Sequence, residues 1–203
     1  MELTIAQINA GVTRAAGAME RIAPLLNAAD AKLGDGDTGS MLARALDKMA
    51  ATDLSDVTRP DEAFARLSRA VLSTTGSSLG TLFGGGLFAL SRQVKGEDTA
   101  DWTALGPALA EAVDTMFARG GAKPGDKTVL DGLVAVAAGL NGSNNAEDAG
   151  ARARQAAHDA LDRFRNRPCR MGRAKFYAER SVGLDDPGML ALALLIDAIA
   201  QAD

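Results

Sequence analysis

Apolar residues recur at intervals of three and four along nearly the whole chain, the spacing that places them on one face of an α-helix. Glycine-, proline- and aspartate-containing stretches interrupt this pattern and divide it into about eight segments without an internal repeat. Each segment can bury its apolar face only by packing against the others. The sequence therefore predicts an all-α fold in which loops join about eight helices.

The expected helices differ in how clearly they begin and end. Pro24 is expected to kink or break the first one, and Pro60 with Asp61 is a favourable first turn for the third. The segment 130–140 is apolar on nearly all sides, as a buried helix would be. The apolar periodicity covers residues 3–26, 42–49, 60–71, 87–90, 102–117, 130–140, 146–164 and 189–200.

Composition limits the class of protein. A chain of 203 residues with 47% apolar content can build the core of a single domain spanning 1–203. The net charge of -4 comes without a basic run, which argues against nucleic acid as a partner. No bilayer-length apolar stretch or signal peptide is visible, and the only cysteine, Cys169, excludes an internal disulfide. We expect a cytoplasmic protein without a membrane contact.

Three carboxylates, Asp30, Asp35 and Asp37, lie within eight positions, and glycines flank the last two. An ordinary solvated turn has a similar composition, and an EF-hand is excluded because Gly39 and Leu46 stand where that loop needs oxygen ligands. Asp30 precedes the turn on a helical stretch and can point back at the other two. Lys32 is the only cation nearby in sequence, so converging carboxylates predict a bound hard cation.

A helix is expected to begin directly after this turn. The first amides of a helix have no partner within it, so free N–H groups here would favour an anion such as a phosphate. The turn therefore predicts a divalent cation and a phosphate bound side by side.

Three further loops attract attention. The glycine- and serine-rich stretch 73–86 fits either the close approach of a phosphate or a seam of helix packing, and composition favours neither. The stretch 120–128 is not a P-loop, because Asp126 precedes Lys127-Thr128 and a helix rather than a strand comes before it. We interpret Lys123 and Lys127 as solvated loop lysines rather than phosphate ligands.

The third loop, residues 166–188, breaks the helical pattern for more than twenty positions and contains or adjoins five arginines. A loop of that length and charge is typical of a lid that closes on an anion. Cys169 within it is interpreted as an incidental thiol. The only histidine, His158, is expected to be solvated on the outer side of its helix, and we assign it no chemistry.

These loops together resemble the nucleotide-binding L subunit of dihydroxyacetone kinase, which also occurs as the C-terminal domain of single-chain dihydroxyacetone kinases. The resemblance covers essentially the full length and implies an antiparallel eight-helix closed barrel with the nucleotide site at one end, formed by interhelical loops. It implies two Mg²⁺ ions on Asp30, Asp35 and Asp37. The motifs appear in the order Asp30 with 34–37, 76–80, 121–128, 172–174, 179–181 and 186–188.

The resemblance also implies contacts with ADP or ATP. Thr38, Met41 and Leu79 depart from the family pattern, which usually has histidine, asparagine and serine there, so some phosphate contacts would come from backbone or from neighbours. Arg173 would lie in the lid and act in catalysis. The implied nucleotide contacts are Thr38, Gly39, Ser40, Met41, Ser78, Leu79, Gly80, Gly121, Val129 or Leu130, Arg173, Asp186, Pro187 and Gly188.

The implied activity is phosphoryl transfer to dihydroxyacetone, or a related short ketose, bound on a separate K subunit. One mode keeps ADP as a prosthetic group that a phosphohistidine protein of the phosphotransferase system rephosphorylates; the other exchanges ATP. The chain length tilts the interpretation toward the first mode, and a homodimer is expected. The alternative is a non-catalytic module that senses a nucleotide or a lipid.

Overall fold

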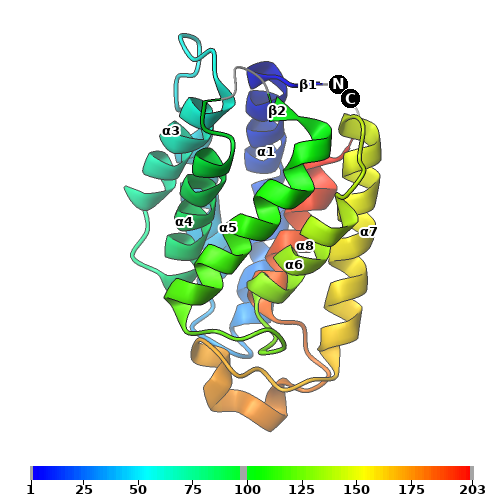
Figure 1. Cartoon of the computed structure of the whole chain (residues 1–203). Helices are drawn as coiled ribbons and strands as arrows, with labels where there is room; N and C mark the ends of the chain where they lie inside the picture. The colour runs from blue at the N-terminus through cyan, green and yellow to red at the C-terminus, as the bar shows by residue number, and fades with distance from the viewer. Residues whose placement is uncertain (1, 97–99, 202–203) are drawn as a thin grey trace.

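A computed structural model describes residues 2–96 and 100–201, and these residues are almost entirely helical (Figure 1). The all-α class predicted from the periodicity is confirmed. Two short strands, β1 (Glu2–Leu3) and β2 (Ala100–Asp101), pair antiparallel. The helices are α1 (Ile5–Asp30), α2 (Thr38–Ala50), α3 (Pro60–Leu72), α4 (Ser78–Gln93), α5 (Leu105–Gly120), α6 (Val129–Gly139), α7 (Ala146–Arg165) and α8 (Pro187–Ile199), with 3-10 helices η1 (Trp102–Ala104) and η2 (Arg173–Ser181).

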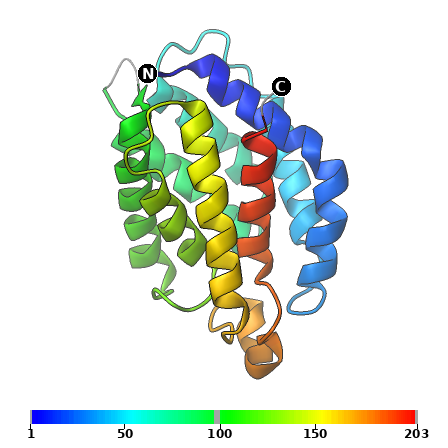
Figure 2. The same cartoon turned by 90° about the vertical axis from the view of Figure 1, so that its right-hand side faces the viewer.

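Each α-helix contacts the next one along the chain, and α8 returns to contact α1, so the contacts run around the set in a ring as an eight-helix barrel requires. The helices run alternately up and down (Figures 1 and 2). The connections α1–α2, α3–α4, α5–α6 and α7–α8 consequently lie toward one end, and both termini lie at the other. The loops singled out in the sequence are these four connections. Among the described helices, none has the length and apolar character needed to cross a bilayer.

Local signals account for where several helices begin. Pro60 and Pro187 occupy the first turns of α3 and α8, where the missing N–H costs no hydrogen bond. Thr4 and Thr128 form capping boxes at the starts of α1 and α6. Of the kink or break expected at Pro24, the break does not occur, because α1 continues through this residue to Asp30. Pro24 lies on the exposed side of the helix, where solvent can satisfy the freed carbonyl group.

The glycine-rich stretch 73–86 divides between two roles. Residues 73–77 form the α3–α4 connection, and helix α4 already begins at Ser78. Within α4, a Cβ added to Gly84 would lie 2.6 Å from Leu72 Cγ and 3.4 Å from the Ser68 carbonyl oxygen, both on α3. The second half of the stretch is therefore a helix-packing seam, while the first half belongs to the end of the barrel that carries the other loops.

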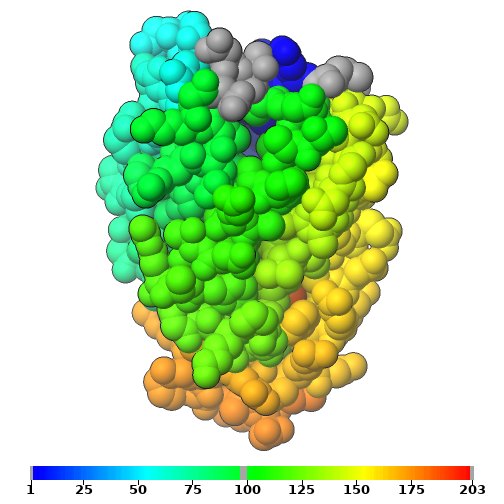
Figure 3. Space-filling model, in the orientation of Figure 1, coloured from blue at the N-terminus to red at the C-terminus, as the bar shows by residue number. Residues whose placement is uncertain are grey.

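The α7–α8 connection, residues 166–186, covers that same end of the molecule and is called the lid below (Figure 3). It contains η2 and a small apolar core of its own, made by Cys169 and Ala174 with Leu33 from the α1–α2 turn. Leu33 and Cys169 are each only 1% exposed. The lid is thus packed onto the turn that carries the aspartates.

Candidate nucleotide and metal site

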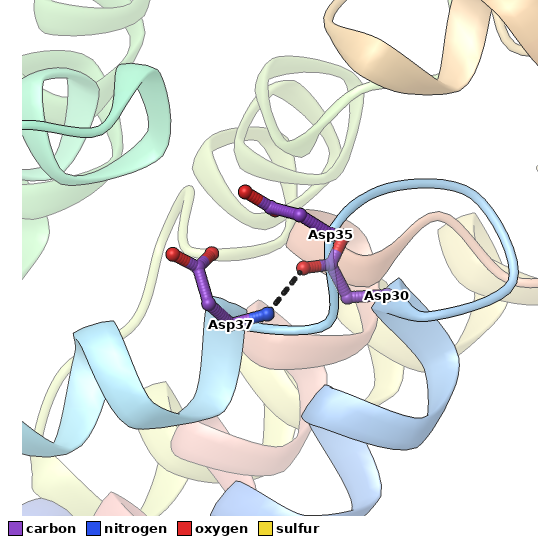
Figure 4. A group of neighbouring side chains, drawn as sticks. All are labelled: Asp30, Asp35 and Asp37. Carbon is purple, nitrogen blue, oxygen red and sulfur yellow. Dashed lines mark hydrogen bonds between the residues drawn. The ribbon is translucent and has the colours of Figure 1, made fainter.

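Asp30, Asp35 and Asp37 converge as the sequence predicts. Each can place a carboxylate oxygen so that all three lie within 4.8 Å of one another (Figure 4). Asp30, the last residue of α1, is 8% exposed, whereas Asp35 and Asp37 are exposed. Oxygen donors at this spacing form the kind of ligand set that Mg²⁺ and Ca²⁺ prefer, so the residues present fit a divalent cation.

Glycine makes this turn possible. The amides of Leu33 and Gly34 bond the Asp30 carbonyl oxygen at 2.9 Å and 2.5 Å, which folds the chain back over the end of α1. A Cβ on Gly34 would overlap the Asp30 carboxylate, and Gly36 has a φ of 78°, in the left-handed region. The two glycines therefore allow Asp35 and Asp37 to return to Asp30.

The amides at the start of α2 are not free, contrary to the sequence-based expectation. Asp30 Oδ2 accepts the N–H groups of Asp37 at 3.0 Å and Thr38 at 3.2 Å. Asn27 Oδ1, one turn earlier on α1, accepts those of Gly39 at 2.7 Å and Ser40 at 3.1 Å. Side chains of α1 thus cap α2 in place of an anion.

Asn27 belongs to the candidate site although no motif in the sequence marks it. Its Nδ2 also donates to Ser40 Oγ at 2.9 Å, so it fixes both the backbone and a side chain of the α2 start. The available signal was its position three residues before Asp30, on the same helix face. Its polar partners lie 12 and 13 positions away and could not be read from that spacing.

Met41 does not reach the site. Its side chain is 4% exposed within the core, and its amide bonds the Asp37 carbonyl oxygen at 2.9 Å. Gly39 has a packing role, because a Cβ there would overlap the Ala23 carbonyl oxygen of α1. The phosphate contacts predicted for residues 38–41 would therefore have to come from the Thr38 and Ser40 hydroxyls rather than from backbone amides.

A cationic side chain lies beside the aspartates, and it is not Lys32, the only one nearby in sequence. Arg173 Nη1 forms an ion pair with Asp35 Oδ2, which brings the lid onto the α1–α2 turn that carries the aspartates. The two residues are 138 positions apart, so sequence proximity could not reveal the pair. Arg173 remains 65% exposed, which leaves much of its guanidinium accessible to a ligand.

The starts of α4, α6 and α8 meet beside the lid. An added Cβ on Gly188 would lie 3.2 Å from Val129 Cβ and 3.5 Å from Leu79 Cδ1, which brings three of the predicted nucleotide contacts together. Leu79 and Val129 are partly exposed and provide an apolar surface. Because Gly188 has no side chain, the starts of α4, α6 and α8 can approach one another closely.

Fewer of the first amides of α4 than of α2 have a hydrogen-bond acceptor within the described residues. Its N-cap residue, Ser77, accepts the Gly80 amide at 3.0 Å. The amides of Ser78 and Leu79 have no partner among the described residues, as expected for the first turn of a helix. Ser78 is also exposed. An anion at this end of the barrel could therefore accept hydrogen bonds from α4.

A profile of the DAK2 domain family matches residues 32–201 of the chain. The chain belongs to this family. It is 31% identical over 177 residues to L-erythrulose 1-kinase of Mycolicibacterium smegmatis, covering 85% of this chain and 31% of that protein. It is 27% identical over 212 residues to the ADP-binding subunit DhaL of the PEP-dependent dihydroxyacetone kinase of Escherichia coli, covering 100% of this chain and 99% of that subunit.

The fold of the DAK2 domain is similar to that of a solved structure, the dihydroxyacetone kinase from C. freundii in complex with AMP-PNP and Mg²⁺. The TM-score is 0.73 at 26% identity, over 98% of this chain and 34% of that one. The chain therefore spans about a third of the length of the kinase from M. smegmatis and of the crystallised kinase.

Asp186 caps helix α8 of the DAK2 domain, where its Oδ1 accepts the Met189 amide at 2.9 Å. Burial raises the pKa of Asp186 to about 6, although this hydrogen bond and the nearby Lys127 ammonium act in the opposite direction. Pro187 and Gly188 follow as buried residues of the first turn. The predicted Asp186-Pro187-Gly188 contact is thus a capped helix start beside Val129 and Leu79.

The α5–α6 connection is held by buried polar groups. Asp131 accepts the Gly125 amide at 2.6 Å and the Thr128 amide at 2.9 Å, which fixes the loop before Val129. Gly121 ends α5 with a φ of 70° and is exposed. No described contact joins Gly121 to the other predicted site residues.

Lys127 is not solvated, contrary to the sequence-based expectation. Its side chain is 1% exposed, and its ammonium donates to the backbone carbonyl oxygens of Arg165, at the end of α7, and Ser181, in the lid. Lys123 is exposed, as predicted. Lys127 therefore cannot reach a phosphate.

The side chains of Cys169 in the lid and His158 on α7 make packing and ion-pair contacts within the protein. Cys169 is buried, and burial raises the pKa of its thiol, which fits the absence of an assigned chemistry. His158 is half-exposed rather than fully solvated, since its Nε2 pairs with Asp197 Oδ2 at 3.0 Å on α8.

Proposed function

We propose that this DAK2 domain binds a magnesium nucleotide, ADP or ATP, and passes a phosphoryl group to dihydroxyacetone, or a related short ketose, held on a separate K subunit. The observation that carries the proposal is the convergence of three carboxylates under a lid arginine at the loop-bearing end of the barrel. The names of the relatives support it: one is an ADP-binding subunit, and the crystallised kinase was solved with AMP-PNP and Mg²⁺.

Asp30, Asp35 and Asp37 would hold the cation. Two Mg²⁺ ions, when bound, would neutralise phosphate charge and polarise the phosphoryl oxygens. Asp30 is oriented for this by the two amides it accepts, which hold its carboxylate toward the turn. Asp35 and Asp37 are exposed and so are accessible from solvent.

The remaining nucleotide contacts divide by chemistry. The amides of Ser78 and Leu79 at the α4 start, with the hydroxyls of Thr38 and Ser40, would bind phosphate oxygens. The apolar surface of Leu79 and Val129 suits the base. Arg173 would place positive charge where the transferring phosphoryl group becomes more negative.

Phosphoryl transfer needs positioning and charge stabilisation more than a protein nucleophile. The ketose would be held by the partner, because His158, the only histidine, pairs with Asp197 on α8. The chain also spans only about a third of the single-chain kinases it matches. These features support a domain that works with a second, substrate-binding part.

The mass and absorbance of the purified, desalted protein test the proposal and separate its two modes. Retained ADP with Mg²⁺ would support the prosthetic-group mode, in which a phosphohistidine protein of the phosphotransferase system recharges the nucleotide. Exchange with added ATP would support the ordinary kinase. A protein that binds neither nucleotide would contradict the proposal and favour a regulatory module.

Replacing Arg173 tests the lid. Arg173→Ala is expected to lower the rate of phosphoryl transfer to a ketose on the K subunit by about a hundredfold, because transition-state charge loses a partner. Its effect on the free energy of unfolding should stay below about 1 kcal/mol, as for an exposed ion pair. Arg170→Ala, at an exposed arginine of the same lid, is the matched control. Equal transfer rates for the wild type and Arg173→Ala would remove Arg173 from the mechanism.

A homodimeric assembly and a cytoplasmic location are also part of this proposal. Light scattering of the purified protein tests the first of them.

A further inference from the structure

Lys127 is the largest fully buried side chain among the described residues, at 1% exposure. It lies in the α5–α6 connection with a φ of 60°, and it is the sole non-glycine residue in the left-handed region in the part of the chain that the structure describes. Both features are costly, since a charge loses its hydration and a side chain enters the left-handed region. A residue kept under these conditions needs compensating contacts.

Those contacts are backbone carbonyl oxygens of the lid and of Arg165, the last residue of α7. Lys127 Nζ lies 3.0 Å from the oxygen of Arg165 and 2.8 Å from that of Arg167, where the chain leaves α7 and enters the lid. It lies 2.8 Å from the oxygen of Ser181 and 2.7 Å from that of Leu184, where the lid returns toward α8. One ammonium group therefore joins the two ends of the lid.

Other bonds connect the same two ends. The Gly183 amide bonds the Arg165 carbonyl oxygen at 2.9 Å, and the Cys169 amide bonds Ser181 Oγ at 2.7 Å. Arg165 Nε pairs with Asp185 Oδ1 at 2.8 Å. Lys127 differs from these contacts because it comes from outside the lid and ties both ends to the α5–α6 connection.

The segment between the joined ends carries Arg173, which reaches Asp35. The backbone on the other side of Lys127 leads directly to Thr128 and Val129, which Asp131 fixes through the Thr128 amide. Lys127 therefore connects the lid that bears Arg173 to the helix start that bears Val129. Its ammonium is fully engaged and buried, so any effect on a nucleotide must pass through these neighbours.

We propose that Lys127 is a positioning residue that holds the lid in the geometry from which Arg173 reaches Asp35 on the α1–α2 turn. The inference rests on the proposed nucleotide site, because its purpose is to place Arg173 over a bound magnesium nucleotide. Burial lowers the pKa of Lys127, while the nearby carboxylates of Asp185 and Asp186 favour the charged form. The carbonyl contacts account for the retention of the ammonium in a desolvated position.

The test uses the isolated chain, titrated with ADP in the presence of Mg²⁺. Lys127→Met keeps the length of the side chain but removes its donors, and it is expected to weaken ADP binding about tenfold. Lys123→Met, at an exposed lysine four positions earlier in the same loop, is the matched control and should bind within about twofold of the wild type.

A double-mutant cycle shows whether Lys127 acts through Arg173. Arg173→Ala alone should also weaken ADP binding about tenfold, and the double variant should bind about as weakly as either single variant. Multiplication of the two effects to about a hundredfold would overturn the proposal, as would unchanged binding by Lys127→Met.

Hydrogen exchange supplies a readout that does not depend on the nucleotide. Lys127→Met should lose amide protection in the lid, at Cys169 and Gly183, while helices α1 to α4 keep theirs. If that variant does not fold, Lys127→Gln keeps two donors on a shorter side chain and should show a smaller loss in the same place. Wild-type protein that fails to bind ADP would contradict the proposed function, and unchanged lid protection in a folded variant would contradict the role of Lys127.

Discussion

The buried carboxylate of Asp30 has two structural roles in the candidate site. One oxygen accepts two amides of the α2 start, and the carboxylate lies within reach of Asp35 and Asp37. Asn27 performs the neighbouring half of the capping, which leaves Asp30 fixed before any ligand arrives. A ligand held in place in advance loses less conformational freedom when a cation binds.

The ionisation of Asp186 is expected to make the stability of the protein depend on pH. Its folded-state pKa of about 6 lies above the ordinary value of 3.8, so the stability it contributes is present below about pH 4 and is lost as pH rises through 6. Asp186→Asn keeps a capping oxygen but cannot ionise. Urea unfolding of both proteins at about pH 5 and about pH 7.5 should show the variant gaining roughly 1 kcal/mol relative to the wild type. If the free energies of unfolding of the variant and the wild type differed by the same amount at both pH values, the raised pKa would be contradicted.

Gly39 governs the approach of two whole elements, α1 and α2. Gly39→Ala would place a methyl group against the Ala23 carbonyl oxygen and should lower the free energy of unfolding by about 2–3 kcal/mol. Gly17→Ala is the matched control on α1, where an added Cβ meets no atom within 4 Å and should stabilise the helix by up to about 1 kcal/mol. Denaturant unfolding compares the two variants, and equal effects would show that the close helix approach is not needed.

The elements that the sequence predicted well are those whose causes are local. The turn of glycines and aspartates and the start of α3 at Pro60 each depend on residues within a few positions. The start of α8 is misplaced by two residues, because the helix begins at Pro187 whereas the apolar periodicity begins only at Met189. A break at Pro24 does not occur, and the sequence could not exclude it because the tolerance of a proline within α1 depends on which side of the helix faces solvent.

The parts of the site that the sequence could not show depend on distant segments. Lys127 looked like an exposed loop lysine because its four acceptors are backbone groups 38 to 57 positions away. Every residue has a backbone carbonyl group, so no sequence motif shows which of these groups accept hydrogen bonds from Lys127. The pair of Arg173 and Asp35 likewise requires the lid to fold over the α1–α2 turn.

At the scale of the whole molecule, the up-and-down order of the helices brings every second connection to one end. Four loops spread over about 150 positions thereby meet without a strand or a second layer of structure. The lid contacts two of the other loops. Leu33 and Asp35 of the α1–α2 turn meet it through an apolar contact and an ion pair with Arg173, and Lys127 of the α5–α6 connection meets it through buried hydrogen bonds. The barrel supplies the frame, and function is concentrated in its loops.

The central claim is that the aspartates bind a nucleotide through a divalent cation, and calorimetric titration with ADP tests it most directly. We expect ADP to bind in Mg²⁺, and binding should be lost in excess EDTA and in Asp37→Ala, whose helix content should match that of the wild type by circular dichroism. Equal ADP binding with and without Mg²⁺, or no binding under either condition, would contradict the account.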